Sequence, residues 1–231
     1  MLIWTQSIKH VIYTHILAGT LSLVAAPVAL AVTKGARAHR LWGKIFFYCM
    51  SWIFVSATWL SIYKNNLFLL LIGVFSFYNV VSGYRSLYHK HLHRGGKPGW
   101  IDWAAVAIAT GFNIYFVAMG VRLLNTGQAI AYLCLLFGSI GLLNAVHSLR
   151  KFLKPPADKN EWLFQHIGGF MGGFIASVTA FSTQVLVFLP DFWVWAWPTL
   201  VGSPLIAFWV RYYKKRLNNG VRLAELVELR R

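Results

Sequence analysis

Seven long apolar runs alternate with short polar segments along this chain of 231 residues. The runs lie at about 10–32, 43–63, 67–88, 100–122, 127–149, 163–189 and 192–213. At 1.5 Å of rise per residue, a helix formed by any of them is long enough to cross a hydrocarbon core of ~30 Å. Within lipid such a run can satisfy its backbone hydrogen bonds as a helix. The pattern predicts an all-α, polytopic transmembrane bundle of seven helices.

The basic residues are distributed unevenly among the connecting segments. If successive runs cross in alternate directions, 19 of the 22 Lys and Arg residues fall on one side, four in each of three loops and seven after the last run. The other side carries only Lys9, Lys64 and Arg122. Short loops rich in Lys and Arg stay in the cytoplasm, so we expect a multi-pass protein of the cell's inner (plasma) membrane with the N-terminus outside and the C-terminus in the cytoplasm.

Composition favours a single membrane domain. The chain is 58% hydrophobic and has a mean hydropathy of +0.56, and one bundle leaves no room for a second soluble domain. We expect a transmembrane domain at 1–214 and a basic cytoplasmic tail at 215–231. In a soluble protein the net charge of +16 would suggest nucleic acid. Here it indicates the bilayer and its anionic headgroups as partners and no nucleic acid, with a partner membrane subunit or a homo-oligomer as a further expectation.

The sixth run contains closely spaced small residues. They are Gly168, Gly169, Gly172, Gly173 and Ser177. Such spacing lets helices in lipid pack closely, which is one interpretation. The other is that Gly169 and Gly173, which share a helix face with His166, form a wall against which a flat cofactor binds.

Three histidines are expected at one depth near the cytoplasmic side. His39 opens the second helix, His147 lies about one turn before the end of the fifth, and His166 about one turn into the sixth. Neutral imidazole is a common metal ligand, so these three are candidate ligands of haem b or of a transition metal such as zinc. Asp102, near the start of the fourth helix, is a further candidate ligand. The alternatives are a backbone or headgroup contact for each histidine, and a helix cap or an arginine partner for Asp102.

The remaining histidines are separate from this set. His15 lies in the outer part of the first helix, roughly 25 Å along the helix from the cytoplasmic set, so it cannot share their site. His89, His91 and His93 form an alternating run in a basic loop. That run either chelates a metal or forms a solvated surface.

Two groups of motifs resemble known families. His15-x3-Gly19 and Lys34-Gly35-x3-His39-Arg40-x2-Gly43, with the later His166-x-Gly-Gly and Trp197-Pro198-Thr199-x2-Gly202-x-Pro204, resemble a family of bacterial multi-pass inner-membrane proteins of unknown function. That resemblance implies the membrane domain and no reaction. The helix histidines are more loosely similar to cytochrome b561 and ferric-reductase-like membrane proteins, whose paired histidines bind haem b. This similarity implies at most one haem, between two of His39, His147 and His166.

Four functions are compatible with these residues. The favoured one is a redox or metal-cofactor protein built on the three histidines. A membrane-embedded metal hydrolase would need Asp102 beside a bound metal. A small-solute transporter would use a polar path, and the absence of membrane-buried acids argues against proton or cation coupling. Its candidate lining residues are Asn79, Asn113, Tyr115, Thr179 and Gln184. The fourth is a non-catalytic accessory subunit.

The charge distribution generates a topology test. Cysteines introduced near Asn66 and Gly127 should react with a membrane-impermeant thiol reagent added outside the cell, whereas a cysteine near Gly96 should not, because only the first two lie in loops poor in basic residues. The reverse labelling pattern would contradict the expected orientation.

Overall fold

The computed structural model describes residues 2–228, with side chains from Ile8 onward, and this part of the chain consists of helices joined by short connections, without strands. Seven long helices and one short one follow in order: α1 (Leu2–Ala31), α2 (Arg37–Tyr63), α3 (Leu67–Arg85), α4 (Trp100–Leu123), α5 (Ala129–Leu153), α6 (Glu161–Val185), α7 (Asp191–Asn218) and α8 (Leu223–Leu226). Single 3-10 turns lie at η1 (Ser86–Tyr88), η2 (Leu92–Arg94) and η3 (Leu124–Thr126).

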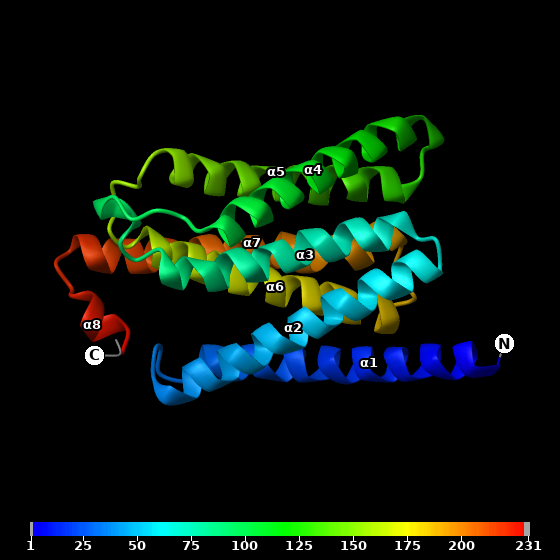
Figure 1. The fold of residues 1–231 in the computed structure, drawn as a ribbon, viewed down its shortest axis with the longest axis horizontal. Coiled ribbons are helices and arrows are strands. Elements are labelled where there is room, and N and C mark those ends of the chain that lie inside the picture. The colour runs from blue at the N-terminus through cyan, green and yellow to red at the C-terminus, as the bar shows by residue number, and fades with distance from the viewer. Residues whose placement is uncertain (1, 229–231) are drawn as a thin grey trace.

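The long helices run roughly along one axis and alternate in direction (Figure 1). The α1–α2 and α4–α5 hairpins lie on opposite sides, with α3, α6 and α7 between them. The α1–α2, α3–α4 and α5–α6 connections lie at the same end as α8, which we call the basic end. The α2–α3, α4–α5 and α6–α7 turns lie at the other, which we call the far end. The predicted segregation of basic loops is therefore present in the fold.

Six of the long helices in the described chain are long and apolar enough to cross a membrane. This confirms the expected all-α, multi-pass membrane bundle at the level of fold class. The exception is α6, which is long enough at 25 residues but carries Glu161, Gln165, His166 and Gln184 together with several hydroxyl side chains. It packs against α1, α3 and α7 inside the bundle.

Large apolar side chains occupy both the interior and the outer surface. One buried cluster joins α3, α4 and α5 through Phe68, Phe116 and Phe137, and another joins α1, α2 and α3 through Ala25, Phe46 and Val80. Outward-facing side chains on several helices are equally apolar, among them Leu17, Val55, Ile108, Leu143 and Phe208. An apolar exterior of this extent suits a lipid environment, because lipid tails solvate such side chains.

The closest approach between two helices in this interior is the crossing of α3 and α6. A Cβ added at Gly169 would lie 2.5 Å from the Asn79 carbonyl oxygen and 2.6 Å from the Gly83 Cα. A Cβ at Gly83 would in turn lie 3.0 Å from the Gly169 Cα. A Cβ added at Gly173 would overlap the side chain of Val80. The close-packing interpretation of the glycine run therefore holds for Gly169 and Gly173.

Polar side chains form hydrogen bonds with backbone groups at the helix ends. The Asn66 side chain accepts a hydrogen bond of 3.1 Å from the Leu69 N–H and so caps α3. The Lys34 ammonium donates to carbonyls at the end of α1, and partial burial lowers its pKa. Helix α7 continues to Asn218, beyond the expected boundary at 214, and the tail returns so that the Glu228 N–H donates to the Lys34 carbonyl at 2.8 Å.

The glycine contacts generate a matched pair of substitutions. Gly169→Ala should lower the free energy of unfolding by about 1–3 kcal/mol, because its methyl group meets backbone atoms of α3 that cannot move independently. Gly168→Ala should leave stability unchanged or raise it by up to ~1 kcal/mol, since nothing lies within 4 Å of its added Cβ and alanine favours helix.

The measurement is the thermal unfolding midpoint of both purified variants in the same detergent. Equal midpoints for the two would show that α3 and α6 are not held together by this glycine contact.

Candidate functional site

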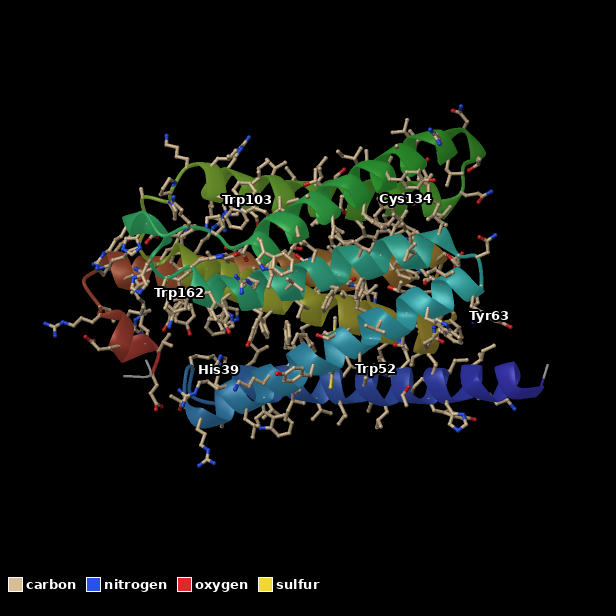
Figure 2. The ribbon with its side chains drawn as sticks, viewed as in Figure 1. His39, Trp52, Tyr63, Trp103, Cys134 and Trp162 are labelled. Atoms are coloured by element: carbon tan, nitrogen blue, oxygen red, sulfur yellow. The ribbon has the colours of Figure 1, made fainter. Side chains whose placement is uncertain are left out.

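Two of the three candidate histidines meet, His39 from α2 and His166 from α6. Their ring centroids lie 6.2 Å apart in an edge-to-face arrangement. His39 Nδ1 lies 2.9 Å from the Ala29 carbonyl oxygen, and His166 Nδ1 lies 3.1 Å from that of Gly83. A carbonyl only accepts, so each Nδ1 carries the proton and each neutral ring keeps a lone pair on Nε2. Figure 2 shows His39 at the basic end, in the same half of the bundle as Trp162.

The third histidine does not join them. The His147 side chain is largely exposed, and its Nε2 lies 3.2 Å from Glu161 Oε1. Residues 2–228 contain no group of three or more His, Cys, Asp or Glu side chains placed to hold one metal ion. The shared depth of His39, His147 and His166 therefore does not bring three imidazoles together, because α5 presents His147 to a different side of α6.

The Asp102 carboxylate is engaged in contacts within the protein. Arg85 Nε and Nη2 donate to its two carboxylate oxygens at 2.8 and 2.9 Å, and the Gly99 N–H donates at 2.7 Å. His89 Nε2 lies 3.2 Å from Oδ2. This buried carboxylate caps the start of α4 and ties it to the end of α3. It is both the helix cap and the arginine partner that were the alternatives to a role in metal binding, and the alternating histidine run contributes His89 to it.

The glycine face offers no slot for a flat cofactor at Gly169 or Gly173. The space in front of both is filled by α3. Gly168 and Gly172, on the neighbouring strip of α6, are different: a Cβ at Gly168 meets nothing within 4 Å, and one at Gly172 makes only ordinary contacts. Both border a large cavity.

This cavity has a volume of about 1180 Å³. Helices α1, α2, α3, α5, α6 and α7 line it, and α6 contributes residues from Glu161 near one end of the bundle to Gln184 near the other. Neither His39 nor His166 borders it. Its wall is largely aliphatic and aromatic, with polar side chains at intervals, which is the composition typical of a small-molecule site.

Polar side chains mark the middle of the cavity and its far end. In the middle, Asn144 Nδ2 donates to Asn79 Oδ1 at 2.9 Å. Toward the far end, His15 Nδ1 lies 2.8 Å from Ser56 Oγ. That hydroxyl already donates its proton to the Trp52 carbonyl at 2.7 Å, so His15 Nδ1 is the donor and Nε2 keeps its lone pair.

The basic end of the cavity holds a network between α5 and α6. Lys151, whose side chain is 7% exposed, donates to Gln165 Oε1 at 2.6 Å, and its ammonium lies 3.8 Å from Glu161 Oε1. Gln165 Nε2 donates to Ser148 Oγ at 3.3 Å. With His147 these residues form what we call the mouth cluster: His147, Ser148, Lys151, Glu161 and Gln165.

The predicted transport path matches this cavity in part. Asn79, Thr179 and Gln184 border it. Asn113 and Tyr115 do not: Asn113 is buried against Gly141 and donates to the Ala109 carbonyl at 2.7 Å, and Tyr115 is exposed on α4.

Sequence reasoning missed the mouth cluster. The charge pattern alone places Lys151 among the cations of the basic loops and assigns no role to Glu161. A usable signal was present, because His147 and Lys151 are four residues apart on α5, as are Glu161 and Gln165 on α6. Each pair therefore presents its polar groups on one helix face, near the end where the two helices connect.

Comparison with protein-family models, with curated proteins and with solved structures found no match to this chain.

The Asp102 contacts generate a stability prediction. Asp102→Asn should lower the free energy of unfolding by about 3 kcal/mol, because it leaves the Arg85 guanidinium without its counter-charge in a mostly buried position. Asp158→Asn is the control, since Asp158 is exposed and its Oδ1 only accepts from the Asn160 N–H, which an amide oxygen also does. Chemical unfolding of both variants in detergent measures the difference, and equal losses would contradict a structural role for Asp102.

Proposed function

We propose that this chain is a seven-helix inner-membrane protein that binds a small amphipathic solute and carries it along the cavity beside α6. The observation that supports this most is the length of the cavity. Its α6 lining extends from Glu161 to Gln184, a difference of 23 positions. At 1.5 Å per residue this is about 34 Å, comparable to the ~30 Å hydrocarbon core.

The same cavity explains how α6, despite its polar side chains, can be a seventh membrane crossing. A helix that borders a cavity with polar side chains at intervals, and that packs between α1, α3 and α7, does not need an apolar surface on every side. The basic end carries most of the Lys and Arg residues and lies in the cytoplasm in this proposal, with the N-terminus outside.

The distribution of charge narrows the class of solute. Among the described lining residues the formally charged ones are Lys64 at the far end and Glu161 and Lys214 at the basic end. Between them the polar groups are hydroxyls and amides, such as Ser22, Asn79 and Thr179, and the imidazole of His15. A path for cations or protons would be expected to contain buried acids. The lining therefore favours a solute with an apolar body and few polar groups.

Cysteine accessibility tests whether the cavity admits solute and water. Ala176→Cys, at a lining position on α6, should react with a charged, water-soluble thiol reagent because the cavity reaches it. Val178→Cys, two residues away and outside the lining, should react much more slowly. Mass spectrometry of the purified, labelled protein measures both, with the parent protein giving the background of Cys49 and Cys134.

Labelling of Val178→Cys at the rate of Ala176→Cys, or of neither above background, would contradict an accessible path along α6. Slower labelling of Ala176→Cys in the presence of a candidate solute would support binding there.

A second candidate function follows from the pair formed by His39 and His166. Two neutral rings with free Nε2 atoms and Nδ1–H groups fixed by backbone carbonyls have the arrangement of metal-binding histidines. The Phe170 ring packs 4.7 Å from the His166 ring, centroid to centroid, and neither histidine borders the large cavity, which favours a small ion over a haem at this pair. The candidate is thus a transition-metal site with two protein ligands.

Metal analysis tests this second candidate. His39→Ala and His166→Ala should each abolish binding of added zinc or copper by the purified protein, whereas His91→Ala, which alters an exposed loop residue, should leave it unchanged. Equal binding by all three variants would remove the metal candidate.

A further inference from the structure

We infer that the mouth cluster and Lys214 recognise an anionic group, a carboxylate or phosphate, at one end of the solute. This inference rests on the proposed function, because it assigns the chemistry of one end of the same cavity. It goes beyond that proposal by naming the part of the solute that enters the basic end and the residues that hold it.

The mouth cluster and Lys214 together carry two lysine ammonium groups and one acid, Glu161. Glu161 Oε1 is shared by His147 at 3.2 Å and by the Lys151 ammonium at 3.8 Å. The shorter contact of Lys151 is to the neutral Gln165 oxygen, at 2.6 Å. A buried ammonium with a shared, distant carboxylate retains a strong attraction for a second anion.

Lys214 brings a further positive charge to the same place. It projects from α7 and borders the cavity opposite α6, with its ammonium 4.7 Å from the centroid of the Phe164 ring. In the described part of the chain no carboxylate lies within ion-pair distance of Lys214, whereas the other cavity-lining charge at this end, Glu161, is already paired. Its ammonium is therefore available to an incoming carboxylate or phosphate, both of which lysine binds well.

The wall beyond the mouth suits an apolar chain attached to that anion. Gly168 and Gly172 follow Phe164 and Gln165 along α6, and a Cβ at Gly168 would meet nothing within 4 Å, whereas one at Gly172 would make ordinary contacts with Asn79. An anion held by Lys214 at this opening, with Lys151 behind the cavity wall, would direct its chain along Gly168. This accounts for a glycine in the run that helix packing does not require.

The test compares four ligands with the purified protein in neutral detergent: decanoate, decyl phosphate, decanol and inorganic phosphate. Direct binding of the radiolabelled decyl ligands is measured, with inorganic phosphate as competitor. Decanoate and decyl phosphate should bind at least tenfold more tightly than decanol, and a similar concentration of inorganic phosphate should not displace them.

Matched lysine variants locate the anion. Lys214→Gln should weaken decanoate binding at least fivefold and leave decanol binding unchanged. Lys215→Gln removes the adjacent charge, which does not border the cavity, and Lys64→Gln removes the lysine at the far end. Both should bind decanoate like the parent protein. All three positions are exposed, so folding should be preserved, and a thermal unfolding midpoint equal to that of the parent verifies this.

The outcomes separate the inference from the proposed function. Equal binding of decanoate and decanol, both lost in Gly168→Phe, would overturn the anion inference and keep the cavity as the solute site. Loss of decanoate binding in Lys64→Gln, or displacement by inorganic phosphate alone, would also overturn the inference. Binding of no decyl ligand, or binding unaffected by Gly168→Phe, would contradict the proposed function itself.

Discussion

The contact on which the rest of the bundle depends is the approach of α3 to α6 at Gly83 and Gly169. Any side chain larger than hydrogen at Gly169 would overlap the α3 backbone, so this pair sets the separation of the two central helices. In lipid, where apolar burial gives little preference for one helix contact over another, close backbone packing of this kind supplies specificity. It fixes which strip of α6 meets α3 and which strip is left to border the cavity.

The polarity of α6 follows from that division of its surface. Its hydroxyl and amide side chains would be unfavourable against lipid, but α1, α3 and α7 surround it and the cavity accepts its remaining polar groups. In the described chain, the one long helix that is not among the candidate membrane spans is therefore surrounded by other helices. Adjacent glycines on this helix have different roles, since Gly169 and Gly173 pack against α3 while a Cβ at Gly168 would meet nothing within 4 Å.

Hydropathy and charge predicted the helices and the grouping of their loops, because both depend on local composition. The run at 67–88 corresponds to α3 and the end of η1, and that at 163–189 overlaps α6. Depth was also predictable for the histidines. Which of the histidines meet was not predictable, because depth along a helix says nothing about the direction in which the helix presents a side chain. That direction depends on packing, which places His166 beside His39 and His147 beside Glu161.

The buried Asp102 and the half-buried Glu161, both at the basic end, show how charge balance separates structure from function in this protein. The Asp102 carboxylate contacts a bidentate arginine, a backbone N–H and a histidine, so its charge and its hydrogen-bond acceptors are already satisfied within the protein. Glu161 is shared between His147 and Lys151, and Lys214 adds a further positive charge at the same opening. Of these cations Lys151 is buried and shares Glu161 with His147, so an anion entering beside the exposed Lys214 would add to its neutralisation. The imbalance at Glu161, in contrast to the completed network at Asp102, is therefore what points to a ligand.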